Sequence, residues 1–80
     1  MEKQELIARV NTVLAEEFEK EINDLTPDAN IKATLELDSL SLVDMVALIE
    51  AEFKVKITGT EVSQIKTFAE LYDFIEERLK

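Results

Sequence analysis

The stretch at residues 35–53 constrains the fold more than any other part of the chain, because a helical period begins there directly after a helix-capping signal. Apolar residues recur on one helical face, at Val43, Val46, Ile49 and Phe53. We therefore predict a helix over residues 39–53 with these side chains on its buried face. Asp38 and Ser39 are both good N-caps, because a short side-chain oxygen can accept hydrogen bonds from the first free backbone N–H groups. A serine placed there projects away from the bundle, near the positive end of the helix dipole.

Two more long helices and one short helix follow from the rest of the pattern. An apolar stripe at helical spacing predicts a first helix over residues 3–18. Thr67 and Glu70 match a capping box, so we expect the last helix to start there. Residues 60–65, which follow a turn at Thr58-Gly59, fit a short helix of one to two turns.

The connection over residues 19–37 is unusually long for a compact domain. Pro27 restricts the residue before it to extended geometry, so we expect a loop here. Its irregularly spaced apolar residues are interpreted as anchors onto the bundle: Ile22, Leu25, Ile31, Leu35 and Leu37. The predicted fold is a single all-α domain over residues 1–80, a four-helix bundle with three longer helices, one short helix and a long loop between helices one and two.

The composition excludes several classes of function. The chain has no cysteine and no histidine, so it lacks the usual general base and the usual metal ligand and needs no oxidising compartment. Its net charge of −9, from 18 acidic and 9 basic residues, disfavours nucleic acid as a partner and favours basic protein surfaces. No apolar run is long enough to span a membrane, and no signal-peptide pattern opens the chain. We expect a cytoplasmic monomer without a metal or a membrane partner.

Catalysis by the chain itself is not expected. The chain has no histidine to activate Ser39, and nothing in the sequence marks a Ser–Lys nucleophile pair, so the pattern disfavours hydrolysis. Asp24, Asp28 and Asn30 lack the spacing, the central glycine and the closing glutamate of a calcium loop. The sequence therefore indicates a protein that is not an enzyme.

The residues around Ser39 form a pattern that is found in a known family: Asp38-Ser39-Leu40, Val43, Asp44, Glu50 and Phe53. This set resembles the 4′-phosphopantetheine attachment region of acyl carrier proteins. The resemblance continues without a gap downstream, at Ile57, Val62, Ile65, Thr67 and Ile75. A lone Asp-Ser-Leu triplet is common, but here it stands at a predicted helix start in an acidic chain with this helix layout.

The resemblance implies a carrier function. Ser39, preceded by Asp38, would be esterified by 4′-phosphopantetheine from coenzyme A, and the thiol of that arm would hold acyl groups as thioesters. The residues alone leave two alternatives open: Ser39 acts only as a helix cap, or Ser41, two residues on, supplies the modified hydroxyl. We choose Ser39 because the family pattern places the attachment directly after the aspartate.

Partners and an acyl-chain pocket also follow from the resemblance. The implied partners are a phosphopantetheinyl transferase and enzymes of acyl-chain synthesis or transfer with basic docking patches. The residues assigned to docking are Asp38, Leu40, Asp44, Glu50 and Glu61. The same acids form a plain solvated face in the simpler reading. The pocket between the helices is assigned to residues that are otherwise plain core: Val46, Ile49, Ile57, Val62, Ile65 and Leu71.

The sequence thus predicts an acyl carrier for fatty-acid biosynthesis or related acyl-chain synthesis, such as that of polyketides or specialised lipids. Two positions depart from the common family pattern, since Glu36 replaces a glycine and Ser41 replaces an acid. They leave open whether the carrier serves the main fatty-acid route or a side pathway. Peptidyl and D-alanyl carriers rank lower. The alternatives from other classes are an unmodified small acidic helical interaction module and an acidic calcium-responsive protein.

Overall fold

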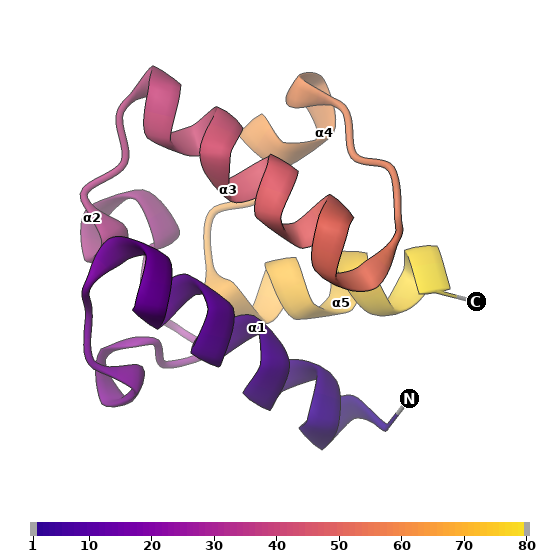
Figure 1. Cartoon of the computed structure of the whole chain (residues 1–80), viewed down its shortest axis with the longest axis horizontal. Helices are drawn as coiled ribbons and strands as arrows, with labels where there is room; N and C mark the ends of the chain where they lie inside the picture. Colours follow the sequence, from indigo (N-terminus) through magenta and orange to yellow (C-terminus); the bar gives the residue numbers. More distant parts are fainter. Residues whose placement is uncertain (1, 80) are drawn as a thin grey trace.

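Three long helices set the architecture of the chain, which a computed structural model describes over residues 2–79. They are α1 (Lys3–Phe18), α3 (Ser39–Phe53) and α5 (Phe68–Leu79). Three short elements lie between them: the 3-10 helix η1 (Ile22–Asp24), α2 (Ile31–Leu35) and α4 (Gly59–Ser63). Figure 1 shows α1 and α3 crossing in front of α5, with α4 beyond the far side of α3. The predicted all-α bundle of three longer helices and a short one is confirmed.

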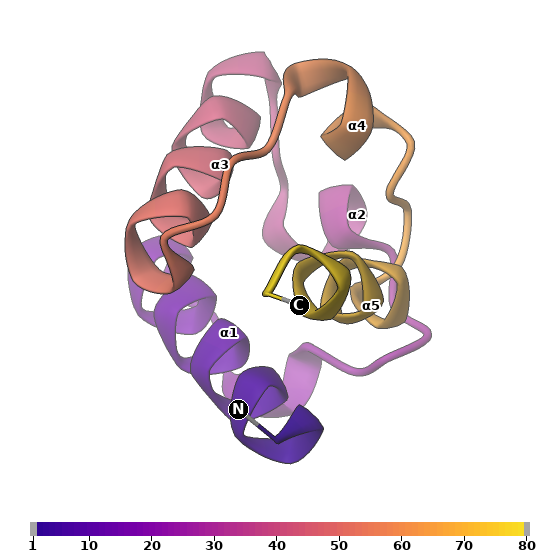
Figure 2. The ribbon, with the colours of Figure 1, turned by 90° about the vertical axis from the view of Figure 1, so that its right-hand side faces the viewer.

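One hydrophobic core fills the space between the long helices. In Figure 2, α5 is seen end-on, with α1 and α3 along one side of it. All three helices bury apolar side chains in this core: Leu6, Val10, Leu14, Met45, Ile49, Phe53, Phe68, Leu71, Tyr72 and Ile75. The Tyr72 hydroxyl donates a hydrogen bond to Asn11 Oδ1 and so satisfies its polar end. Among the described residues, no polar or charged residue is buried, so burial of apolar surface holds these helices together.

The long connection is more ordered than the predicted loop, so that prediction is wrong for residues 22–24 and 31–35. Asn30 caps α2 by accepting a hydrogen bond from the Ala33 N–H at 2.9 Å. Leu25, Ile31 and Leu35 are buried anchors, as expected, but Ile22 is about half exposed. A helix as short as α2 is too short to show an apolar period in the sequence, so only its cap at Asn30 marks it.

Backbone hydrogen bonds fix this connection to the start of α5. The Ile31 N–H donates to the Lys66 carbonyl at 2.9 Å, and the Ala69 N–H donates to the Pro27 carbonyl at 2.9 Å. These bonds place α2 beside the beginning of the last helix and hold the chain that leads into α3.

Capping explains where the later helices begin. The box predicted at the start of α5 is present, because the Thr67 N–H donates to Glu70 Oε1 at 3.2 Å and the Glu70 N–H donates to Thr67 Oγ1 at 3.3 Å. A second box, not predicted, joins Thr58 and Glu61 at the start of α4. The short helix therefore begins at Gly59, one residue earlier than expected, and Thr58-Gly59 is its entry rather than a separate turn.

The buried face of α3 differs from the predicted stripe. Ile49 and Phe53 are buried and Val46 is partly buried, but Val43 is 64 % exposed. Met45 takes the core position instead, at 1 % exposure. The reason is that α3 is apolar around most of its circumference, so spacing alone does not decide which side meets α1. Within residues 2–79, no helix is long and apolar enough to cross a membrane.

Candidate functional site

Ser39 is the first residue of α3, and its side chain is exposed. The cap of the helix is Asp38, whose Oδ1 accepts a hydrogen bond from the Ser41 N–H at 2.8 Å. Among the residues that the structure describes, the Ser39 hydroxyl makes no hydrogen bond. Ser39 therefore does not cap the helix, and its hydroxyl is exposed at the positive end of a helix of 15 residues.

The rival hydroxyl, Ser41, is occupied and less accessible. Hydrogen bonds from the Ser41 backbone N–H first, and from its hydroxyl second, hold the pKa of the Asp38 carboxyl below its ordinary value. Ser41 is also partly buried, whereas Ser39 is exposed. The local structure thus separates the two serines, since one completes the cap and the other is free to react.

An exposed apolar surface adjoins the serine on α3. The side chains of Leu40 and Val43 are 78 % and 64 % exposed. A cleft of about 180 Å³ between α3 and α4 continues this surface and is lined only by apolar residues and a glycine: Leu42, Val43, Val46, Gly59 and Val62. Exposed apolar side chains gathered in one place are typical of surfaces that bind partners or ligands.

This cleft overlaps only in part with the predicted acyl-chain pocket. Val46 and Val62 line it, but four other predicted residues do not: Ile49, Ile57, Ile65 and Leu71. Those four are at most 9 % exposed and belong to the core. The prediction missed Leu42 and Val43, although both lie three or four residues after Ser39 and so share its helical face.

The residues predicted to dock partners divide into two groups. Asp38, Leu40 and Asp44 lie within seven residues at the start of α3 and are exposed. Asp44 makes no ion pair within residues 2–79. The other two carboxylates, Glu50 and Glu61, have partners within the molecule, and their part in docking stays a prediction.

Glu50 and Glu61 both satisfy backbone groups. Glu50 Oε2 accepts a hydrogen bond from the Ile57 N–H at 2.9 Å. Glu61 closes the capping box of α4 and also forms an ion pair with Arg78 of α5. A carboxylate with a backbone or cationic partner is less available to a second protein, so the free acidic charge near Ser39 is mainly that of Asp44.

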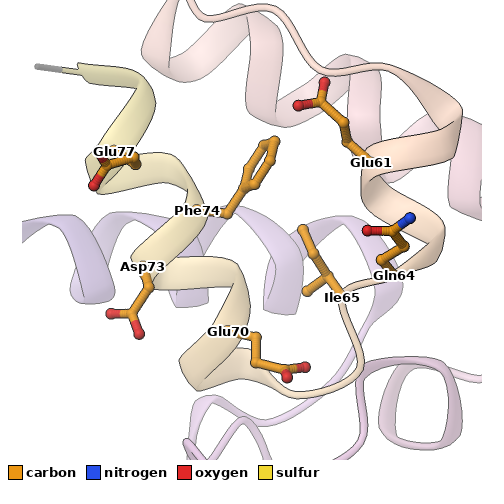
Figure 3. A pocket seen from close by; sticks show the side chains of 7 residues that line it. All are labelled: Glu61, Gln64, Ile65, Glu70, Asp73, Phe74 and Glu77. Carbon is orange, nitrogen blue, oxygen red and sulfur yellow. The ribbon is translucent and has the colours of Figure 1, made fainter.

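A wider groove of about 520 Å³ separates α4 from α5, and Figure 3 shows the acids that surround Phe74 in it. These acids already have partners inside the molecule. Glu70 accepts hydrogen bonds from the Lys66 and Thr67 N–H groups, which lower the pKa of its carboxyl, and Asp73 pairs with Lys3. The groove shares no lining residue with the cleft at α3. We assign it no part in the carrier site.

A smaller hollow of about 240 Å³ opens directly at the serine. It is lined by residues from α2, the following connection and α3: Lys32, Leu37, Asp38, Ser39 and Leu42. Sequence reasoning missed Lys32, because α2 itself was not predicted and its residues were not expected near Ser39. No group of three or more histidine, cysteine, aspartate or glutamate side chains within residues 2–79 is arranged to hold a metal ion.

Comparison with known proteins decides the family. The family model described as "Phosphopantetheine attachment site" matches residues 8–75, which include all of α3. The acyl carrier protein of Guillardia theta is 32 % identical over 79 residues, covering 99 % of this chain and 98 % of that protein. The chain belongs to the acyl carrier protein family. Such proteins are carriers rather than enzymes, and they hold a covalently attached 4′-phosphopantetheine.

Further relatives agree along the whole length. The acyl carrier protein of Petrotoga mobilis is 33 % identical over 79 residues, covering 99 % of this chain and 93 % of that protein. A crystal structure of the acyl carrier protein of Thermotoga maritima superposes with a TM-score of 0.80 at 29 % identity, covering 99 % of this chain and 92 % of that one. The carrier fold and its covalent cofactor are thus established here, and the alternative of an unmodified interaction module is not supported.

Proposed function

We propose that Ser39 is the attachment residue of this acyl carrier. The proposal rests on one observation at the start of α3. Asp38 caps the helix, and the exposed Ser39 hydroxyl makes no hydrogen bond within the described residues. An exposed hydroxyl without a hydrogen bond at a helix start can enter the active site of a transferase. Ser41, held by Asp38, is a poorer substrate.

Loading is a phosphoryl transfer in which this chain supplies only the nucleophile. The Ser39 Oγ forms a bond to the phosphorus that bears the pantetheine, a P–O bond of the coenzyme A pyrophosphate breaks, and 3′,5′-ADP leaves. We assign the hydroxyl proton to a base of the transferase, because the chain has no histidine and the neighbouring Asp38 carboxylate is engaged by Ser41. The arm then supplies the thiol that holds acyl groups as thioesters, and its tether raises the effective concentration of the acyl group at each partner enzyme.

The test is direct mapping of the modification. Unmodified protein is incubated with coenzyme A and a phosphopantetheinyl transferase, and intact mass and fragmentation spectra are recorded. We expect one phosphopantetheine per chain, with fragment ions that place it on Ser39. A modification that maps to Ser41, or a chain that stays unmodified under conditions that load another carrier, would contradict the proposal.

The exposed face of α3 beside Ser39 is the proposed docking surface for the transferase and for enzymes of acyl-chain synthesis or transfer. Leu40 and Val43 offer apolar contact, and Asp44 offers a charge for basic patches on those partners. Exposed charge pairs contribute little each, so docking through them is weak, fast and sensitive to salt. Such binding suits a carrier that visits several enzymes in turn.

The cleft between α3 and α4 is the proposed entry for the acyl chain. Its lining is apolar, and Leu42 belongs both to this cleft and to the hollow at Ser39, so the two openings adjoin. We place the carrier in fatty-acid or related acyl-chain biosynthesis in the cytoplasm, acting as a monomer. The names of the relatives support the acyl class, and the pathway within that class is part of the proposal.

A further inference from the structure

The hollow beside Ser39 combines groups of complementary chemistry. It is lined by Ser39, by Lys32 and Asp38, which carry opposite charges, and by the apolar residues Leu37 and Leu42. The hollow is open, with a volume of about 240 Å³. It is therefore large enough for a small part of a flexible ligand rather than for a whole cofactor.

The backbone holds Lys32 in place relative to the serine. Its carbonyl accepts the Leu37 N–H at 3.0 Å and also the Glu36 N–H that closes α2. Leu37 is followed by Asp38, whose carboxylate is fixed by Ser41. The side chain of Lys32 thus starts from a backbone position that hydrogen bonds fix, and both Lys32 and Ser39 line the hollow.

Lys32 is a cation without an ion-pair partner among the described residues. Lys3, Arg9, Lys20 and Arg78 all pair with carboxylates. Lys32 makes no ion pair within residues 2–79, even though the chain has 18 acidic residues. Lys54, Lys56 and Lys66 make no ion pair in the same part of the chain either, but none of them lines the hollow, and Lys56 lies beyond the opposite end of α3.

A phosphodiester on Ser39 would need such a cation. It carries one negative charge at neutral pH, and it would stand next to the ionised Asp38 carboxylate, which repels it. The positive end of α3 offsets part of this repulsion. A flexible ammonium group within reach offsets more, because lysine binds phosphate as a mobile point charge.

We propose that Lys32 binds the phosphodiester of the prosthetic arm at Ser39, and that Leu37 and Leu42 contact the geminal methyl groups that follow it. This inference rests on the proposed attachment at Ser39. The root of the arm then rests in the hollow against α2, while the distal part with its thiol stays free to reach partner enzymes. Starting from Ser39, the arm has an anionic phosphodiester and then a branched apolar unit. The phosphodiester is complementary to Lys32, and the branched unit is complementary to Leu37 and Leu42.

The test uses the loaded protein and nuclear magnetic resonance. In wild-type holo-protein we expect nuclear Overhauser effects between the arm's geminal methyl groups and the methyl groups of Leu37 and Leu42. We also expect the Lys32 Cε–Hε signal to shift on loading while that of Lys56 stays in place. Phosphorus-31 relaxation should report a restricted phosphodiester.

Two charge-matched variants give the contrast. Lys32→Gln should increase the fast motion of the phosphodiester and weaken the methyl contacts by about twofold to fivefold, the range expected for one exposed ion pair. Lys56→Gln, with the same loss of charge, should change neither. Absent methyl contacts in the wild type, or equal phosphorus relaxation in both variants, would overturn the inference.

The experiment separates this inference from the proposed function. Intact mass and fragment mapping show whether Ser39 is loaded at all. A chain loaded on Ser39 whose arm root makes no contact with the hollow contradicts only the role of Lys32. A chain whose modification lies elsewhere contradicts the attachment itself. Because the methyl contacts are measured in the wild type, the test holds even if a variant loads slowly.

Discussion

The carboxylate of Glu50 accepts a hydrogen bond from the backbone N–H of Ile57 at 2.9 Å, which ties α3 to the loop that leads into α4. Ile57 is only 7 % exposed, so its N–H has little access to water if this acceptor is lost. Glu50 looks like one more member of an acidic surface in the sequence. In the structure it anchors the segment that positions one wall of the apolar cleft.

Glu50 should therefore matter for stability. We expect Glu50→Ala to lower the free energy of unfolding by about 1–3 kcal/mol, because a buried N–H loses a charged acceptor. Urea denaturation measures the change. Glu52→Ala is the matched control on the same helix, since its carboxylate is 3.9 Å from Arg9 and such an exposed pair contributes less than about 1 kcal/mol. Equal losses in the two variants would show that the bond to Ile57 is not important.

Asp44 should behave in the opposite way. It is exposed and makes no ion pair in the described part of the chain, so Asp44→Lys should leave the unfolding curve nearly unchanged. We expect this variant to be loaded more slowly by the transferase at low salt, because attraction to a basic patch becomes repulsion. High salt should reduce the difference. A folded Asp44→Lys protein that loads at the wild-type rate in low salt would show that this part of α3 is only a solvated face.

Glu19 offers a stabilising substitution. It ends α1 in the left-handed conformation, with φ 55° and ψ 48°, which glycine adopts without steric cost. Its negative charge also stands at the negative end of the helix dipole. Glu19→Gly should raise the free energy of unfolding by about 0.5–1 kcal/mol, measured by thermal or urea denaturation. Glu16→Gly, inside the same helix, is the control and should destabilise.

The cap at Asp38 predicts a pH dependence. The pKa of the Asp38 carboxyl lies below its ordinary value because Ser41 donates hydrogen bonds to the ionised carboxylate in the folded protein. A group with a depressed folded-state pKa stabilises the fold above its unfolded pKa, near 3.8, and that stability is lost as the pH falls through the lower folded value. The stability difference between wild type and Asp38→Ala should therefore be largest at neutral pH and shrink on acidification below about pH 4. A difference that stays constant down to about pH 2 would mean that the charge of the cap is irrelevant.

Local signals in the sequence predicted the parts of the fold that depend on local contacts. The box at Thr67 and Glu70 was predictable because a helix start is satisfied by residues three apart. Asn30, which caps α2, is a signal of the same kind and marks a helix that we did not predict. The carrier family could be recognised because the triplet at Ser39 stands at a helix start.

Contacts between distant segments account for the rest. The choice of Met45 rather than Val43 for the core depends on where α1 lies, which the apolar surroundings of α3 do not specify. Likewise, the bond between Glu50 and Ile57 depends on the course of a loop, so its carboxylate could not be told apart from that of Asp44. The position of Lys32 beside Ser39 depends on α2 and on the turn at Glu36, whose φ of 54° lies in the left-handed region.

The measurement that tests the central claim most directly is loading of two single variants by a phosphopantetheinyl transferase with coenzyme A, read by intact mass. Circular dichroism first confirms that both variants are folded. Ser39→Ala should gain no phosphopantetheine, because the exposed hydroxyl that makes no hydrogen bond within residues 2–79 is gone, whereas Ser41→Ala should be loaded as completely as wild type. Loading that persists in folded Ser39→Ala, or that disappears in folded Ser41→Ala alone, would contradict the assignment of Ser39.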